Sequence, residues 1–210
     1  MMTTQSLERF PPRRTQRGRR AEAEARLVQA AIELIAEKGV QGLVLSEVGE
    51  RAGYSRGLPA HYFGSRIALI VTTAQRTVEG FADRVEAHLH GSSGLPAVLR
   101  FVADYLGNAQ DDPVSARALL IVSTEATINP ELGRPLRELN DRTVARIARA
   151  IEEGQSAGEI RRDVDATAQA RLVLAAARSS VAQWLTEPDQ VDLTALRCAL
   201  LAVLERGLAP

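Results

Sequence analysis

Apolar residues recur every three or four positions along most of the chain, which is the spacing of amphipathic helices rather than of strands. In residues 21–38, for example, Leu27, Ala31, Leu34 and Ile35 form a single apolar stripe. Runs in which apolar and polar residues strictly alternate do not recur. The pattern therefore predicts an all-α protein whose first helix is residues 21–38.

Capping residues mark where later helices begin. Ser65 can accept from the free N–H groups of a long helix, and Asp112, Asn129 and Asp192 each precede proline or an apolar run. The apolar runs between these signals predict helices at residues 65–88, 96–110, 113–128, 131–157, 164–186 and 193–208.

The segment SEVGERAGYSRGLPAHYFGSR, which starts at Ser46, has the pattern of two short helices joined by a tight turn. Ser46 can cap the first helix, in which Val48 and Ala52 share one face. Gly53 supplies the left-handed backbone that ends a helix, and Ser55 can cap the second one. This arrangement predicts a helix-turn-helix.

The sequence also resembles a known family in this region. Gly-Tyr-Ser-Arg-Gly from Gly53, His-Tyr-Phe-Gly-Ser-Arg from His61, and AAIELIAEKG from Ala30 look like the tetracycline-repressor (TetR) family of bacterial transcription regulators. The resemblance implies a helix-turn-helix DNA-binding domain of three helices (21–66) and a larger helical domain for effector binding and dimerisation (67–210). It implies a homodimeric repressor that a small organic effector releases from a palindromic double-stranded operator.

In a helix-turn-helix the second helix enters the major groove, and the first crosses the phosphate backbone. The residues expected to contact DNA are Ser46, Ser55, Arg56, Gly57, Leu58, Ala60, His61, Tyr62 and Arg66. Phe63 is expected to be core. The family usually has a larger apolar residue at Pro59 and an aromatic residue at Ala60, so its base preference does not carry over. Pro59, near the fourth position, predicts a locally distorted but intact helix.

Charge is distributed unevenly along the chain, although its net charge is zero. Residues 1–66 hold 11 Lys/Arg and 7 Asp/Glu, a balance of +4, whereas residues 67–210 hold 15 and 19, a balance of −4. The first twenty residues are rich in arginine and proline and lack apolar periodicity, which predicts a disordered basic arm. Its Arg17, Arg19 and Arg20 are candidates for phosphate contact, and a tail without a role is the alternative.

The resemblance also implies an effector pocket between the middle helices of the second domain. A mostly apolar lining with a few polar groups suits a small organic ligand. The candidate lining residues are Phe81, Val85, Phe101, Tyr105, Leu119, Val122, Ser123, Arg178 and Trp184. Their helical spacing is equally typical of core residues.

The last two helices are the expected dimer interface. One carries an apolar stripe and the other offers small residues for close approach. The residues concerned are Leu193, Leu196, Leu200, Val203 and Leu204, with Ala175, Ala176, Ser179 and Ser180. Periodicity does not distinguish this face from one buried inside a single subunit.

Other classes of protein are less consistent with the sequence. His88 and His90 point to different faces of a helix, so neither a metal site nor another cofactor is expected, and no catalytic motif appears. Cys198, the single cysteine, is expected to be a buried thiol. The chain has no secretory or membrane-spanning pattern, which predicts a cytoplasmic protein. An architectural DNA-binding protein and a helical ligand carrier or interaction module remain the alternatives.

Overall fold

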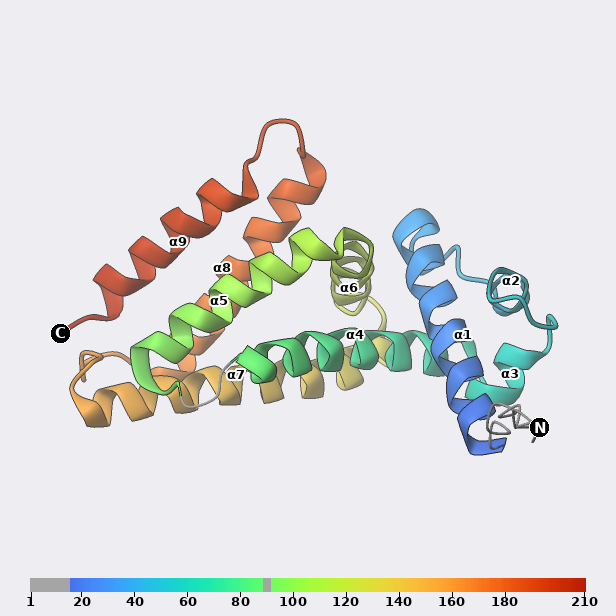
Figure 1. Ribbon diagram of the computed structural model, residues 1–210, viewed down its shortest axis with the longest axis horizontal. Coiled ribbons are helices and arrows are strands. Elements are labelled where there is room, and N and C mark those ends of the chain that lie inside the picture. The colour runs from blue at the N-terminus through green and yellow to red at the C-terminus, as the bar shows by residue number, and fades with distance from the viewer. Residues whose placement is uncertain (1–15, 89–91) are drawn as a thin grey trace, which may run out of the picture.

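The computed structural model describes residues 16–88 and 92–210, apart from the side chains of residues 81–88. Within that part the protein consists of nine α-helices and has no strand, which confirms the all-α prediction (Figure 1). In chain order they are α1 (Gln16–Lys38), α2 (Leu45–Arg51), α3 (Leu58–Phe63), α4 (Arg66–His88), α5 (Gly94–Asp111), α6 (Pro113–Glu125), α7 (Pro130–Ala157), α8 (Ala166–Thr186) and α9 (Leu193–Leu208).

The predicted capping residues do begin helices α4, α6, α7 and α9. Side-chain oxygens of Ser65, Asp112, Asn129 and Asp192 each accept a hydrogen bond from a backbone N–H of the first turn, at 2.8–3.2 Å. These bonds satisfy N–H groups that have no partner within the helix. Local side-chain chemistry therefore fixes where most of the larger helices start.

One buried core lies beneath the N-terminal helices. Leu27, Ala31, Leu34 and Ile35 of α1 are each 0% exposed, so the predicted stripe is confirmed. The same core includes the first half of α4, α6 and the start of α7. It therefore extends beyond the N-terminal unit expected at residues 21–66, and that boundary stays a prediction.

A second core joins α5, α7, α8 and α9, and α4 runs from the first core towards it (Figure 1). Figure 1 shows α1, α2 and α3 at one end of the molecule and α9 on the far side of the larger bundle. The helix-turn-helix and the C-terminal helices are thus held at opposite ends of one helical body.

The C-terminal helices turn much of the predicted interface stripe inward. Leu193 is buried, and Leu200 and Leu204 pack on the second core, whereas Val203 is 57% exposed. The prediction that Cys198 is a buried thiol is wrong: it is exposed, because it lies on another face of α9 from those leucines.

Candidate DNA-binding site

The helix-turn-helix depends on a close approach of backbone between α2 and the turn that leads to α3. Gly53 has a φ of 78°, the left-handed conformation expected of a glycine that ends a helix. The N–H of Tyr54 donates to the carbonyl oxygen of Gly49 at 2.8 Å. A Cβ on Gly49 would lie 2.5 Å from the carbonyl oxygen of Ser55. The absence of a side chain at Gly49 therefore allows this tight turn.

Two predicted caps of this motif are wrong. Ser46 lies inside the first turn of α2, which is preceded by the extended residue Val44 and has no side-chain cap. Ser55 does not cap α3 with its hydroxyl either; its backbone carbonyl accepts from the N–H of Leu58 at 3.1 Å. The turn continues through residues 56 and 57 before the helix begins, so Ser55 is too far from the first helical N–H groups to act as the N-cap.

Proline is better accommodated in α3 than the sequence predicted. Pro59 is the second residue of the helix, not the fourth, and it is buried. At that position its missing N–H has no partner to lose within the helix. The helix is intact, with six residues, and Gly64 ends it with a φ of 74°.

The outer face of the turn and of α3 contains most of the predicted base-reading residues. Arg56, Gly57, Ala60 and His61 are exposed. Leu58 is half-buried and packs on the first core, so it does not share their exposure. Phe63 packs on the same core, in agreement with its expected structural role.

The start of α1 lies beside the end of α3. The prediction of a disordered arm over residues 1–20 is wrong for residues 16–20, which form the first turns of α1; residues 1–15 lie outside the described part. The guanidinium of Arg20 lies 5.7 Å from the ring centroid of Tyr62, which is within the range of a cation–π contact. Continuing the helix upstream is what brings Arg20 to Tyr62, and the sequence pattern did not reveal this contact.

Only some of the arginines near the helix-turn-helix have an acidic partner among the described residues. Arg17 and Arg19 are exposed, and within the described residues neither has an ion-pair partner. Arg56, which is 77% exposed, pairs with Glu50. Arg66 is half-buried, and its Nη1 donates to the carbonyl oxygen of Val40 at 2.8 Å. Arg66 therefore ties the start of α4 to the loop before α2.

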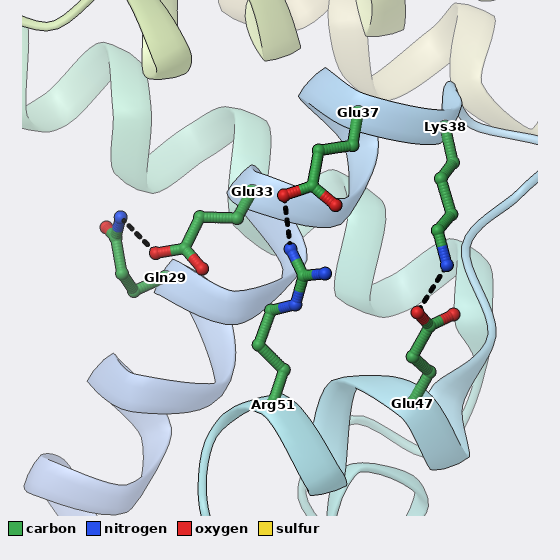
Figure 2. Close-up of polar contacts among 6 residues, drawn as sticks. All are labelled: Gln29, Glu33, Glu37, Lys38, Glu47 and Arg51. Carbon is green, nitrogen blue, oxygen red and sulfur yellow. Dashed lines mark hydrogen bonds and ion pairs between the residues drawn. The ribbon is translucent and has the colours of Figure 1, made fainter.

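Ion pairs fasten α2 to α1 (Figure 2). Arg51 Nη1 lies 2.6 Å from Glu37 Oε1, and Lys38 pairs with Glu47. The hydrogen bond from Arg51 lowers the pKa of Glu37 below its ordinary value, and the same bond raises the pKa of Arg51. Both pairs cross between the two helices at the surface, above the apolar contacts that hold α2 on α1.

A second candidate site is a cavity of about 240 Å³ among α4, α5, α6, α7 and α8. Of the predicted pocket residues, four line it: Phe101, Tyr105, Leu119 and Arg178. Val122, Ser123 and Trp184 do not line this cavity, and the side chains of Phe81 and Val85 lie outside the described part. The remaining lining residues, which the sequence reading missed, are Val78, Glu79, Asn108, Leu136, Leu139, Asn140, Arg142, Thr143, Arg146 and Leu174.

The missed lining residues on α7 had a signal in the sequence. Leu136, Leu139, Thr143 and Arg146 are spaced three or four apart, so they share one face of that helix. Such a stripe is equally typical of a core face, which is why spacing did not single it out.

Over the described part of the chain, no group of three or more His, Cys, Asp or Glu is placed to hold a metal ion. None of the helices described there is both long and apolar enough to cross a membrane.

Comparison with known proteins identifies the family. The family described as BetI-type transcriptional repressor, C-terminal, matches residues 96–209, and the family described as bacterial regulatory proteins, tetR family, matches residues 27–72. The chain belongs to the TetR family. The predicted resemblance is thereby confirmed, and the protein is a DNA-binding transcription regulator.

Individual proteins that are similar to this chain are also named as transcription regulators. The HTH-type transcriptional regulator CymR of Pseudomonas putida is 31% identical over 144 residues, which are 68% of each chain. A putative TetR-family transcriptional regulator from Rhodococcus sp. has a TM-score of 0.79 at 25% identity, over 90% of this chain and 100% of that one. A putative transcriptional regulator from Saccharomonospora viridis, solved in complex with choline, has a TM-score of 0.78 at 26% identity, over 90% and 99% of the two chains.

Proposed function

We propose that the protein is a homodimeric repressor that binds a palindromic operator through α3 and leaves it when a small organic effector fills the cavity. The observation that carries this proposal is the exposed surface of Arg56, Gly57, Ala60 and His61. The arginine-rich start of α1 lies beside this surface. A regulator of this kind acts in the cytoplasm, where the DNA is, and needs no catalytic group.

Base reading is assigned to the exposed turn and helix. His61 and Arg56 carry donors that reach base edges or phosphates, and Ala60 offers a methyl group for apolar contact in the major groove. Arg17, Arg19 and Arg20 suit contact with phosphates, because two of them are exposed without an ion-pair partner in the described part and the third lies on Tyr62. Pro59 and Leu58 support the helix from within.

The homodimer is assigned to the outer faces of α8 and α9. Leu172 on α8 and Val203 on α9 are 61% and 57% exposed, so they give these two faces apolar surface that a second subunit can cover. Ala175 and Ser179, one and two turns after Leu172, are exposed and small enough for another helix to approach closely. Two recognition helices spaced about one helical turn apart, roughly 34–36 Å, would then read a palindrome.

Coupling between the cavity and the DNA-binding end is assigned to α4 and α6. Leu119 of α6 lines the cavity and is also buried in the first core beneath α1. α4 begins at the helix-turn-helix and contributes Val78 and Glu79 to the cavity wall. An effector that weakens operator affinity a hundredfold must distinguish the two conformations by about 2.7 kcal/mol.

The test is operator binding measured by fluorescence anisotropy on DNA from upstream of the protein's own gene and its neighbours. Specific binding that weakens with salt is expected, and Arg56→Ala should weaken it by about 1–3 kcal/mol. Arg134→Ala is the matched control, because Arg134 is equally exposed but lies on α7 and pairs with Glu138. An intact dimer that shows no specific, salt-sensitive site would refute the proposal.

Two outcomes would point to the alternatives. Equal affinity for random DNA and no response to any effector would favour an architectural DNA-binding protein. A protein that binds small ligands yet ignores every duplex would favour a helical carrier or interaction module.

A further inference from the structure

Arg178 on α8 is a half-buried cation with incomplete pairing. Its Nη2 donates to Oδ1 of Asn140 on α7 at 2.9 Å, and its Nε is buried without a hydrogen-bond partner. Among the described residues no carboxylate pairs with it. A buried N–H of a guanidinium normally has a hydrogen-bond partner, because an unsatisfied charged donor away from water is costly. Arg178 therefore retains both positive charge and donor capacity at the cavity wall.

The rest of the cavity combines an apolar wall with an excess of positive charge. Phe101 and Tyr105 lie with ring centroids 5.9 Å apart, and Leu174 adds to the apolar surface. Among the described residues, the charged side chains that line the cavity are three arginines, Arg178 with the exposed Arg142 and Arg146, and one acid, Glu79. The field inside the cavity therefore favours a negative ligand.

We infer that the effector is a small amphipathic monocarboxylate, whose apolar body lies against Phe101 and Tyr105 and whose carboxylate pairs with Arg178. This inference rests on the effector-binding role proposed for the same cavity. The planar fork of a guanidinium matches a carboxylate with two parallel hydrogen bonds. The volume of about 240 Å³ is below the roughly 300–1,000 Å³ of sites for drug-sized ligands, which favours a compact molecule over a long acyl chain.

A quaternary ammonium ligand is the competing chemistry, since the Saccharomonospora viridis protein was solved with choline. Here the faces of Phe101 and Tyr105, with the carboxylate of Glu79, could attract such a cation. Arg178 would repel it, and repulsion between like charges is strong where water is excluded. The net charge of the described lining side chains therefore favours the anion.

The test uses the purified full-length protein without DNA and three probes: 3-phenylpropionate, its neutral amide 3-phenylpropionamide, and choline. Binding is measured by titration calorimetry and by the shift in thermal unfolding temperature. The acid is expected to bind at least tenfold more tightly than the amide, and choline is expected to bind more weakly than the acid. Equal affinity for acid and amide, tighter binding of choline, or no binding of the acid at millimolar concentration would each overturn the inference.

Variants assign the binding to Arg178. Arg178→Gln should weaken binding of the acid about ten- to hundredfold and leave the amide unchanged, because a hydrogen bond to a charged group is lost. Arg178→Lys keeps the positive charge but loses the two parallel donors of the guanidinium, so it should weaken binding of the acid less than Arg178→Gln does. Arg171→Gln is the matched control, since Arg171 also bridges α8 to α7, through Asp141, but is exposed and does not line the cavity. Equal binding of the acid by Arg178→Gln and Arg171→Gln proteins would refute the assignment.

These experiments distinguish a variant that does not fold from one that does not bind, and they test the effector separately from operator binding. Circular dichroism checks that each variant is helical, and if Arg178→Gln does not fold, the comparison of acid with amide on the unaltered protein still decides. A protein that binds 3-phenylpropionate through Arg178 but no operator would contradict the proposed function and leave this inference standing. Operator binding together with equal affinity for acid and amide would contradict this inference and leave the proposed function standing.

Discussion

Gly49 is where α2 comes closest to the turn before α3, and enlarging it should displace the recognition helix. A Cβ there would lie 2.5 Å from the carbonyl oxygen of Ser55 and 3.2 Å from Cδ of Pro59. Because ordinary contact begins near 3.4 Å, the carbonyl would have to withdraw by about 0.9 Å. Gly49→Val adds two further methyl groups at this point. The obstacle is backbone, which cannot rotate away as a side chain can.

The expected cost is at the upper end of the range for overpacked sites, about 3 kcal/mol. For a protein of this length each kcal/mol lowers the unfolding temperature by about 2–4 °C, so Gly49→Val should melt about 6–12 °C below the unaltered protein. Any variant protein that remains folded should bind the operator more weakly, because α3 is tilted away from the orientation that fits the groove.

Gly57→Val is the matched control within the same motif. Gly57 has a φ of −84°, which any residue adopts, and a Cβ there would meet nothing within 4 Å. The unfolding temperature of the Gly57→Val protein should stay within about 2 °C of that of the unaltered protein, as for other substitutions at exposed positions. Thermal unfolding followed by circular dichroism measures both variants. Equal melting of the Gly49→Val and Gly57→Val proteins would refute the role assigned to the close approach.

Two further predictions concern α1 and α9. Because the pKa of Glu37 is lowered from 4.5, its bond to Arg51 stabilises the fold fully above that value and is lost as pH falls through the lowered pKa. As pH is lowered, the unfolding temperature of the unaltered protein should therefore fall more steeply than that of the Glu37→Gln protein. Parallel curves of unfolding temperature against pH would contradict this. Asp192→Ala removes the cap of α9 and should cost about 1 kcal/mol, or about 2–4 °C, whereas Asp189→Ala in the same loop should not.

The helix-turn-helix combines features that depend on neighbouring residues with features that depend on packing. Gly53 was predicted correctly, because a left-handed backbone is a property of one residue and its neighbours. The caps at Ser46 and Ser55 were predicted wrongly. α2 begins one residue before Ser46, which leaves Ser46 inside its first turn, and the start of α3 depends on how tightly the turn is drawn against α2. That distance is set by Gly49, whose significance appears only when Ser55 is folded back onto it.

The residues that line the cavity were also only partly predictable from the sequence. Phe101, Tyr105, Leu119 and Arg178 could be proposed as lining residues from the sequence with the family resemblance, yet Val122 has the same apolar character and is buried in the first core instead. Which residues a cavity exposes depends on the angles at which five helices cross, and no helix encodes its crossing angle alone.

By itself, the sequence determined the all-α class, the positions of most helices, the helix-turn-helix and the family, because periodicity, caps and short motifs are local properties of the chain. The tertiary structure decided which faces are shared. It brought Arg20 onto Tyr62, engaged Arg66 with Val40 and exposed Cys198, and among the described residues it left the buried Nε of Arg178 without a hydrogen-bond partner. Each of these depends on residues far apart in sequence, whose distance is set only when the helices pack.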